Sequence, residues 1–158
     1  MKKALLLLLS TFALLTFSCQ SKFVLNYWNG VVTEIEKIED LDSEQLFEIS
    51  QEWFNKNFNS SGAAVDFCDK DMGRIIGRNI AKTFSYQYSG HYYYSVLIDV
   101  KNEKARISLK YQSDASLDGD FGLTPKNPQF QEIVTNEFQE IAEEYFEFIN
   151  ERQKALAE

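Results

Sequence analysis

Residues 92–101 read YYYSVLIDVK, and this stretch decides the fold because a large apolar side chain occupies every second position. In a strand with this sequence Tyr94 and Val96 lie on one side, and Ser95 and Asp99 lie on the other. A period of two residues predicts a strand with one packed and one solvated face. Strands of this kind are typical of antiparallel sheets that are covered on one face only.

Four more segments have the alternation and the turn boundaries of strands. They are residues 31–38, 63–69, 74–88 and 105–111. In the first of these segments we expect Val31, Thr33 and Ile35 to face inward. In the third, Gly77 predicts a β-bulge inside a long strand.

Two helices with apolar stripes complete the domain. The first, residues 43–58, follows Asp42, and Gln45 three residues later completes a capping box. Its apolar positions are Leu46, Ile49, Trp53, Phe54 and Phe58. The closing helix, residues 129–154, carries the stripe Phe130, Ile133, Val134, Phe138, Ile141, Tyr145, Phe148 and Ile149. The order β-α-β-β-β-β-α predicts one α+β domain over residues 31–154.

The N-terminus has the pattern of an export signal. Lys2 and Lys3 precede an apolar run over residues 4–17, which is too short to span a membrane comfortably, and small Ser18 precedes Cys19. This pattern predicts a signal peptide at residues 1–18 and lipidation of Cys19. Membrane attachment would then occur through the N-terminal lipid.

A second interpretation of the same residues stays open. Thr16 and Phe17 depart from the usual bacterial lipobox, and Thr16 with Ser18 also fits ordinary signal-peptidase cleavage. Both interpretations make Cys19 the first mature residue and residues 19–30 a tether. They place the protein outside the cytoplasm, in the periplasm or at the outer membrane.

Several motifs resemble a known family. They are WFNKNF at residues 53–58, DMGRIIG at residues 71–77, and the Tyr-rich strand before KAR at residues 104–106. In this order they resemble a bacterial domain-of-unknown-function family with a TBP-like fold, named after the TATA-binding protein. The resemblance covers residues 31–150. It implies a curved antiparallel sheet with two helices packed on one face, in exported proteins that are often lipoproteins. It implies no activity and no functional residues.

The charge is strongly acidic overall but uneven along the chain. The formal net charge is −8, and it falls to −10 once Lys2 and Lys3 leave with the signal. An acidic, exported protein is a poor binder of nucleic acid, because neutralising phosphates requires a basic surface. Residues 70–112 nevertheless contain eight basic and three acidic side chains. We therefore expect basic strands opposed to acidic helices.

The basic strands define the candidate binding surface. On the helix-free face of the sheet we expect a ligand-binding set made of Arg78, Lys82, Tyr93, Leu97, Arg106 and Lys110. Such a face suits an acidic peptide, an anionic glycan, a lipid headgroup or an envelope protein. The alternative is that Lys and Arg on solvent-facing strands only deter edge-to-edge aggregation.

Other residues with chemical potential give weaker signals. His91, placed between two strands, could act as a base, and Asp118 with Asp120 could form a hydrolytic or calcium-binding loop. Cys68 is expected to be a small buried apolar residue, or a disulfide partner of Cys19 if Cys19 is not lipidated. We expect no metal and no cofactor. The sequence favours a non-catalytic binding or assembly module. A small periplasmic hydrolase using His91 or the Asp118/Asp120 loop, and a structural lipoprotein without a ligand, are the alternatives.

Overall fold

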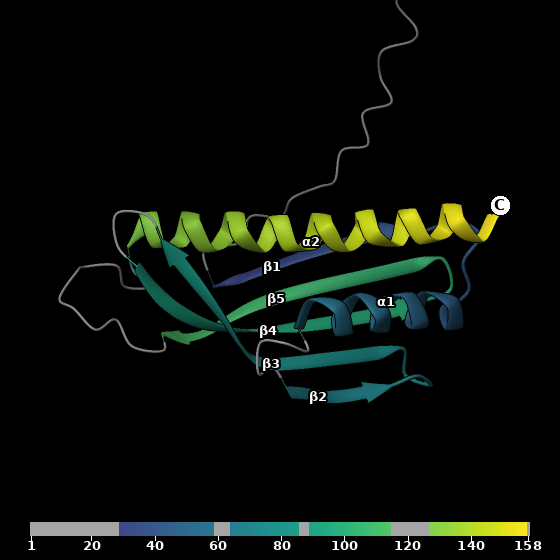
Figure 1. Ribbon diagram of the computed structural model, residues 1–158, viewed down its shortest axis with the longest axis horizontal. Helices are drawn as coiled ribbons and strands as arrows, with labels where there is room; N and C mark the ends of the chain where they lie inside the picture. The colour runs from purple at the N-terminus through teal and green to yellow at the C-terminus, as the bar shows by residue number, and fades with distance from the viewer. Residues whose placement is uncertain (1–28, 59–63, 86–88, 115–126, 158) are drawn as a thin grey trace, which may run out of the picture.

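The computed structural model describes residues 29–58, 64–85, 89–114 and 127–157 (Figure 1). The strands are β1 (Val31–Lys37), β2 (Ala64–Asp69), β3 (Arg74–Ser85), β4 (Ser89–Lys101) and β5 (Lys104–Asp114). The helices are α1 (Ser43–Phe58) and α2 (Pro128–Ala157). Neither of these two helices is long and apolar enough to cross a membrane.

The strands form one antiparallel sheet in the order β1-β5-β4-β3-β2. Helix α2 lies along β1 and β5, and α1 lies over β4 and β3, so that both helices cover the same face (Figure 1). This arrangement confirms the predicted α+β fold with five strands. We call the face without helices the open face.

The alternation in β4 and β5 produces this arrangement. Tyr94, Val96 and Ile98 are buried, and Val96 pairs with buried Leu109 of β5. The residues between them in the sequence, such as Ser95, are half-buried on the open face. The apolar face of β4 and β5 therefore forms one side of a single core, and the stripes of α1 and α2 form the other.

The prediction for β1 was wrong. The register pairs Ile35 with Arg106, which places Ile35 on the open face with 64% of its surface exposed. Glu34 and Glu36 occupy the helix-covered side instead, where both are half-buried. Because β1 is an edge strand, neither of its faces is fully covered, and its alternation is a weak guide to the inward side. Inward-pointing charges on an edge strand also oppose pairing with another chain.

Bulges change the pairing register within β3 and β4. The predicted bulge at Gly77 is confirmed, because the pairing with β4 shifts between Gly77 and Ile80. His91 lies within β4 opposite Thr83, not in a turn as expected, because the strand begins at Ser89. The side chain of His91 and the Asp118/Asp120 loop lie outside the described residues.

A buried hydrogen bond between Tyr145 and Ser50 joins the two helices inside the core. The Tyr145 hydroxyl lies 2.7 Å from Ser50 Oγ, and Ser50 Oγ donates to the Leu46 carbonyl oxygen at 2.6 Å. The Tyr145 ring also packs edge-on against Trp53. Burial is the main cause that raises the pKa of Tyr145, so the hydroxyl keeps its proton and donates it to Ser50.

The start of α1 and the turn between β2 and β3 both have well-defined local geometry. The capping box is confirmed: Asp42 Oδ1 accepts from the Gln45 amide at 2.8 Å, and Gln45 Oε1 accepts from the Asp42 amide at 3.1 Å. Gly73, in the turn before β3, has φ of +62° and lies so close to Val100 that a Cβ would sit 2.4 Å from the Val100 carbonyl oxygen. Only glycine fits this turn.

Tyr145→Phe should lower the free energy of unfolding by about 1 kcal/mol, because it removes one buried hydrogen bond. Chemical denaturation of Tyr145→Phe, Ser50→Ala and the double variant measures the coupling between the two side chains. Strictly additive effects of the two substitutions would contradict a stabilising Tyr145–Ser50 hydrogen bond.

Glu34→Gln should stabilise the protein at neutral pH. Burial, followed by the nearby Glu143 and Glu36 carboxylates, raises the pKa of Glu34, so the fold disfavours its charged form. The penalty is present above the raised pKa and disappears as the pH falls below the ordinary value. Thermal melts at pH 7 should show a gain worth a few tenths of a kcal/mol, since the site is only half-buried. At about pH 4 and below the gain should vanish, and a gain that persists there would contradict this assignment.

Candidate functional site

The register arranges the open face as rows of side chains that cross the strands. One row is apolar and hydroxylic, and it contains Thr33 of β1, Ser108 of β5, Leu97 of β4, Ile76 of β3 and Phe67 of β2. The neighbouring row on one side contains Ile35, Arg106, Asp99, Arg74 and Asp69. The open face is therefore partly apolar in its middle and charged toward the turn between β4 and β5.

A groove of about 920 Å³ lies over the apolar row and over the adjacent row on the side away from the charged row. Its apolar lining comes from Val31, Ile76 and Leu97, its hydroxyls from Thr33, Ser95 and Ser108, and its cations from Arg78 and Lys110. Thr33 Oγ1 donates to Ser108 Oγ at 3.0 Å across the β1–β5 pair, which orders part of the floor. A groove with an aliphatic floor, several hydroxyls and two cations suits an anionic ligand that also has apolar groups.

Three of the predicted binding residues, Arg78, Leu97 and Lys110, line this groove. Arg78 forms an ion pair with Asp66 at 2.8 Å, so its charge is partly neutralised. Lys110 is exposed and has no ion-pair partner among the described residues. Lys110 is therefore the principal cation that the groove offers to a ligand.

The other predicted residues lie elsewhere. Arg106 is on the open face but beyond the groove, beside Asp99. Tyr93 is half-buried and does not line the groove. The bulge in β3 brings Lys82 opposite the core residue Tyr92, whereas the register before the bulge would place it opposite His91. The side chain of Lys82 lies outside the described residues.

Cys68 was expected to be buried, and this prediction was wrong. Its thiol is free and exposed, because β2 is the other edge of the sheet. The Gln51 amide lies 3.5 Å from the sulfur. Partial burial, followed by the charge of Asp69, raises the pKa of the Cys68 thiol, which keeps it in the weakly reactive protonated form.

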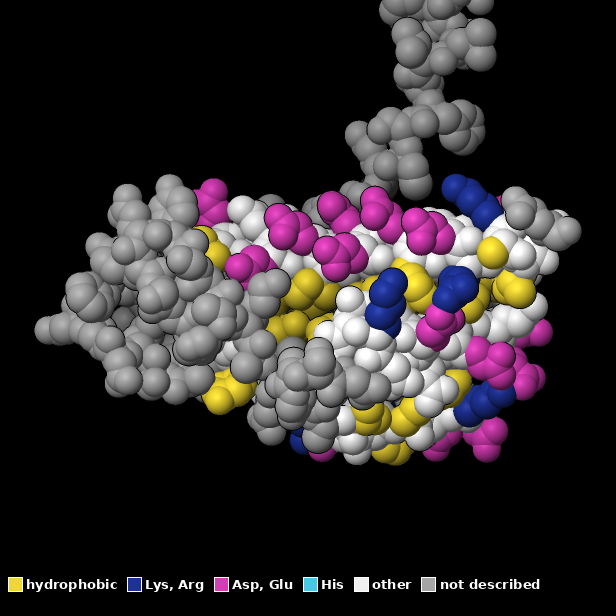
Figure 2. Space-filling model, in the orientation of Figure 1, with side chains coloured by type: hydrophobic (Ala, Val, Ile, Leu, Met, Phe, Trp, Pro, Cys, Tyr) yellow, Lys and Arg dark blue, Asp and Glu magenta, His cyan; other side chains and the backbone are white. Residues whose placement is uncertain are grey.

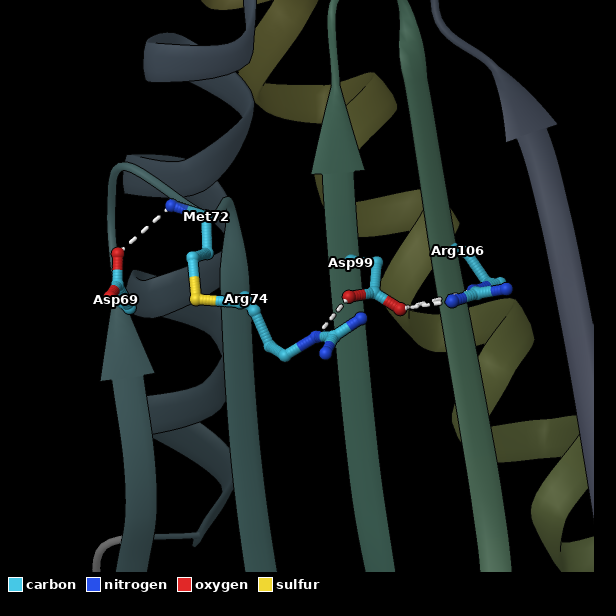
Figure 3. A network of polar contacts seen from close by, with 5 residues as sticks. All are labelled: Asp69, Met72, Arg74, Asp99 and Arg106. Atoms are coloured by element: carbon cyan, nitrogen blue, oxygen red, sulfur yellow. Dashed lines mark hydrogen bonds and ion pairs between the residues drawn. The ribbon is translucent and has the colours of Figure 1, made fainter.

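A charged network spans three strands beside the groove (Figure 3). Arg74 Nε donates to Asp99 Oδ1 at 2.6 Å, and Arg106 donates to Asp99 Oδ2 through Nε at 3.2 Å and through Nη2. Burial alone would raise the pKa of Asp99, but the hydrogen bonds and charges of the two guanidinium groups outweigh it and hold the pKa below its ordinary value. Two guanidinium groups share one carboxylate, so the network keeps a net positive charge.

A second depression of about 400 Å³ lies over this network. It is lined by the side chains of Arg74, Arg106, Lys101 and Lys104, with exposed Met72 and Ile35 among them. The register aligns Lys104 with both Lys37 and Lys101. The open face thus has a second cationic region at the end near the β4–β5 turn.

The two faces of the molecule differ in charge. Acidic side chains follow the outer surface of α2 (Figure 2), where Glu140, Glu143, Glu144 and Glu147 are exposed. Lys101, Lys104 and Lys110 of the open face have no ion-pair partner among the described residues. The predicted opposition of basic strands and acidic helices is present.

Comparison with known proteins gives the family. The family model described as "Domain of unknown function (DUF4468) with TBP-like fold" matches residues 33–112. The chain belongs to this family. The match runs from within β1 to within β5, and these five strands build the open face. A search of the curated proteins finds no match.

Two solved structures are similar in fold to this chain. A TBP-like protein from Parabacteroides distasonis ATCC 8503 superposes with a TM-score of 0.63 at 14% identity, over 81% of this chain and 96% of that one. A DUF4468 family protein from Bacteroides ovatus ATCC 8483 superposes with a TM-score of 0.53 at 13% identity, over 73% of this chain and 85% of that one. At this identity the similarity shows the fold alone.

The groove residues that sequence reasoning missed include Val31, Thr33, Ser95, Ile76 and Ser108. Val31 and Thr33 were missed because β1 was assigned the wrong inward side. Ile76, Ser95 and Ser108 carry no charge, and only the strand register brings them together. The sequence feature that could have placed them on the open face was the alternation of side chains in β3, β4 and β5.

Asp99→Asn should lower the free energy of unfolding by about 1–2 kcal/mol at pH 7, because two charged hydrogen-bond donors lose their anionic acceptor. The depressed pKa of Asp99 means that its carboxylate stabilises the fold above the unfolded pKa, and that this stabilisation is lost as the pH falls through the folded value. Urea titrations from pH 7 downward should show the difference from the native protein shrinking below about pH 4. A difference independent of pH would contradict the charge-based account.

Proposed function

We propose that this DUF4468 protein is an exported, lipid-anchored envelope protein that works as a non-catalytic binding module. The proposed binding surface is the open face, and its ligand is an acidic partner. The observation that carries this proposal is the groove of about 920 Å³. It combines an aliphatic floor with Lys110, which has no ion-pair partner in the part of the chain that the structure describes, in a protein whose net charge is −8.

Energetics favour a ligand that is both acidic and apolar. The half-buried side chains of Leu97 and Ile76 offer aliphatic surface that a ligand could remove from water, which is the main source of affinity. Lys110, Lys104 and Lys101 would attract an anion over a distance of about 10 Å at an ionic strength of about 0.1 M, and farther at lower salt. Electrostatics would therefore govern the association rate, and apolar burial would govern the lifetime of the complex.

The cellular location of the protein is proposed from its first residues. Lys2 and Lys3, the apolar run and Cys19 support cleavage after Ser18 and acylation of the new N-terminal cysteine. The tether at residues 19–30 would leave the domain close to the membrane surface with its open face available.

Charge reversal tests the binding surface. Lys104→Glu with Lys110→Glu should weaken binding of a labelled oligo-glutamate peptide about tenfold or more in low-salt fluorescence anisotropy, because two attractive pairs become repulsive. The control is Lys56→Glu with Lys154→Glu, which changes the net charge equally but lies on the helices. Equal losses in both variants, or unchanged binding in the first, would contradict the proposal.

Cys19→Ser tests the anchor. We expect the native protein, expressed in a bacterial host, to incorporate labelled palmitate and to sediment with membranes. The variant should lose the label and enter the soluble fraction, because two or more acyl chains on Cys19 would provide the stable membrane attachment. Membrane retention of an unlabelled variant would contradict lipid anchoring.

A further inference from the structure

The cations of β5 are spaced at the period of an extended chain. Arg106, Ser108 and Lys110 are alternate residues of one strand and share the open face. Arg106 and Lys110 are four residues apart, which corresponds to about 13 Å along a strand. The open face therefore has two cationic positions separated by a fixed distance along β5.

Aliphatic and hydroxyl groups lie midway between the two cations. Ser108 pairs with Leu97 in the register, and Leu97 pairs with Ile76. All three side chains are half-buried, and all three line the groove. An apolar group placed above Leu97 would contact aliphatic side chains, with the Ser108 and Thr33 hydroxyls beside it.

Both cationic positions keep hydrogen-bonding capacity for a ligand. Lys110 is exposed and has no ion-pair partner among the described residues. Arg106 directs Nε and Nη2 toward Asp99, which leaves other N–H groups of its five for an anion. Arg74 shares the same carboxylate, and Lys104 lies two residues before Arg106 on β5, so the Arg106 end remains net positive.

We propose that the open face binds an extended acidic polypeptide segment with the pattern acid-x-apolar-x-acid. This inference rests on the proposed function and narrows it to one class of partner. In an extended chain the side chains at positions one, three and five face the same side, with the same repeat as β5. The two acids meet Arg106 and Lys110 while the apolar side chain covers Leu97.

Other arrangements of the same charges fit less well. Two acids four residues apart on a helix are separated by only about 6 Å along its axis, less than half the spacing of Arg106 and Lys110. The acidic surface of α2 in a second copy carries Glu140, Glu143, Glu144 and Glu147 and offers the floor no exposed large apolar side chain in that stretch. An extended segment supplies both the charges and the apolar group.

Two labelled peptides of identical composition test the spacing. Both contain two glutamates and one leucine in a background of serine, threonine and glycine. In the matched peptide the glutamates are four residues apart with the leucine midway. In the shifted peptide one glutamate moves by one position, which turns it to the other side of an extended chain. Fluorescence anisotropy with the purified protein measures both affinities, and an oligo-glutamate peptide serves as the reference ligand.

The matched peptide should bind about fivefold more tightly than the shifted one, the equivalent of one exposed charge pair. In Lys110→Gln this ratio should fall to about one, whereas in Lys154→Gln on α2 it should stay unchanged. The use of a ratio makes the result independent of small changes in the amount of folded protein.

Four outcomes would overturn the inference. Equal affinity of the two peptides would show that the face binds acidic chains without regard to spacing, and the proposed function would stand alone. Binding of oligo-glutamate without either peptide would have the same meaning. A ratio that survives Lys110→Gln would place the binding elsewhere. Failure of all three peptides to bind would remove the proposed function as well.

Discussion

The structure depends on one constraint, which is that β4 and β5 present apolar side chains to only one side of the sheet. The Tyr94–Val96–Ile98 side must be removed from water, and here α1 and α2 cover it. Both helices carry a matching stripe, and the Tyr145–Ser50 hydrogen bond fixes how they meet. Because both helices are used on this face, the open face has no covering element among the described residues.

An uncovered sheet face must remain soluble while its edges avoid pairing with other chains. Here the edge strand β1 directs Glu34 and Glu36 toward the helix side, and β2 has a register shift between Val65 and Phe67. Both devices disfavour the addition of another strand at the edges. Association through the broad surface of the open face is thereby favoured over association through its edges.

Much of the fold could be predicted from sequence because the signals were local. The alternation of residues 92–101 and the capping box of Asp42 specified a strand and a helix start with little ambiguity. The inward side of β1 could not be predicted, because Val31 and Val32 are both apolar and an edge strand buries neither face fully. Cys68 was misjudged because its burial depends on the position of β2 in the sheet.

The candidate site was only partly predictable for a related reason. Arg78, Leu97 and Lys110 were found because charge and alternation are visible in the chain. Grouping Ser95, Ser108 and Thr33 with them requires the pairing between strands, and the bulge after Gly77 changes the register that leads to Lys82. Register is a tertiary property, and a single sequence specifies it weakly wherever bulges occur.

The most direct test of the account is NMR chemical-shift mapping of the isotope-labelled protein titrated with an acidic peptide. The account predicts shifts concentrated in the amides of Thr33, Leu97 and Ser108 and in their neighbours on the open face, with the amides of α2 unchanged. Shifts confined to α2, or spread evenly over both faces, would contradict it.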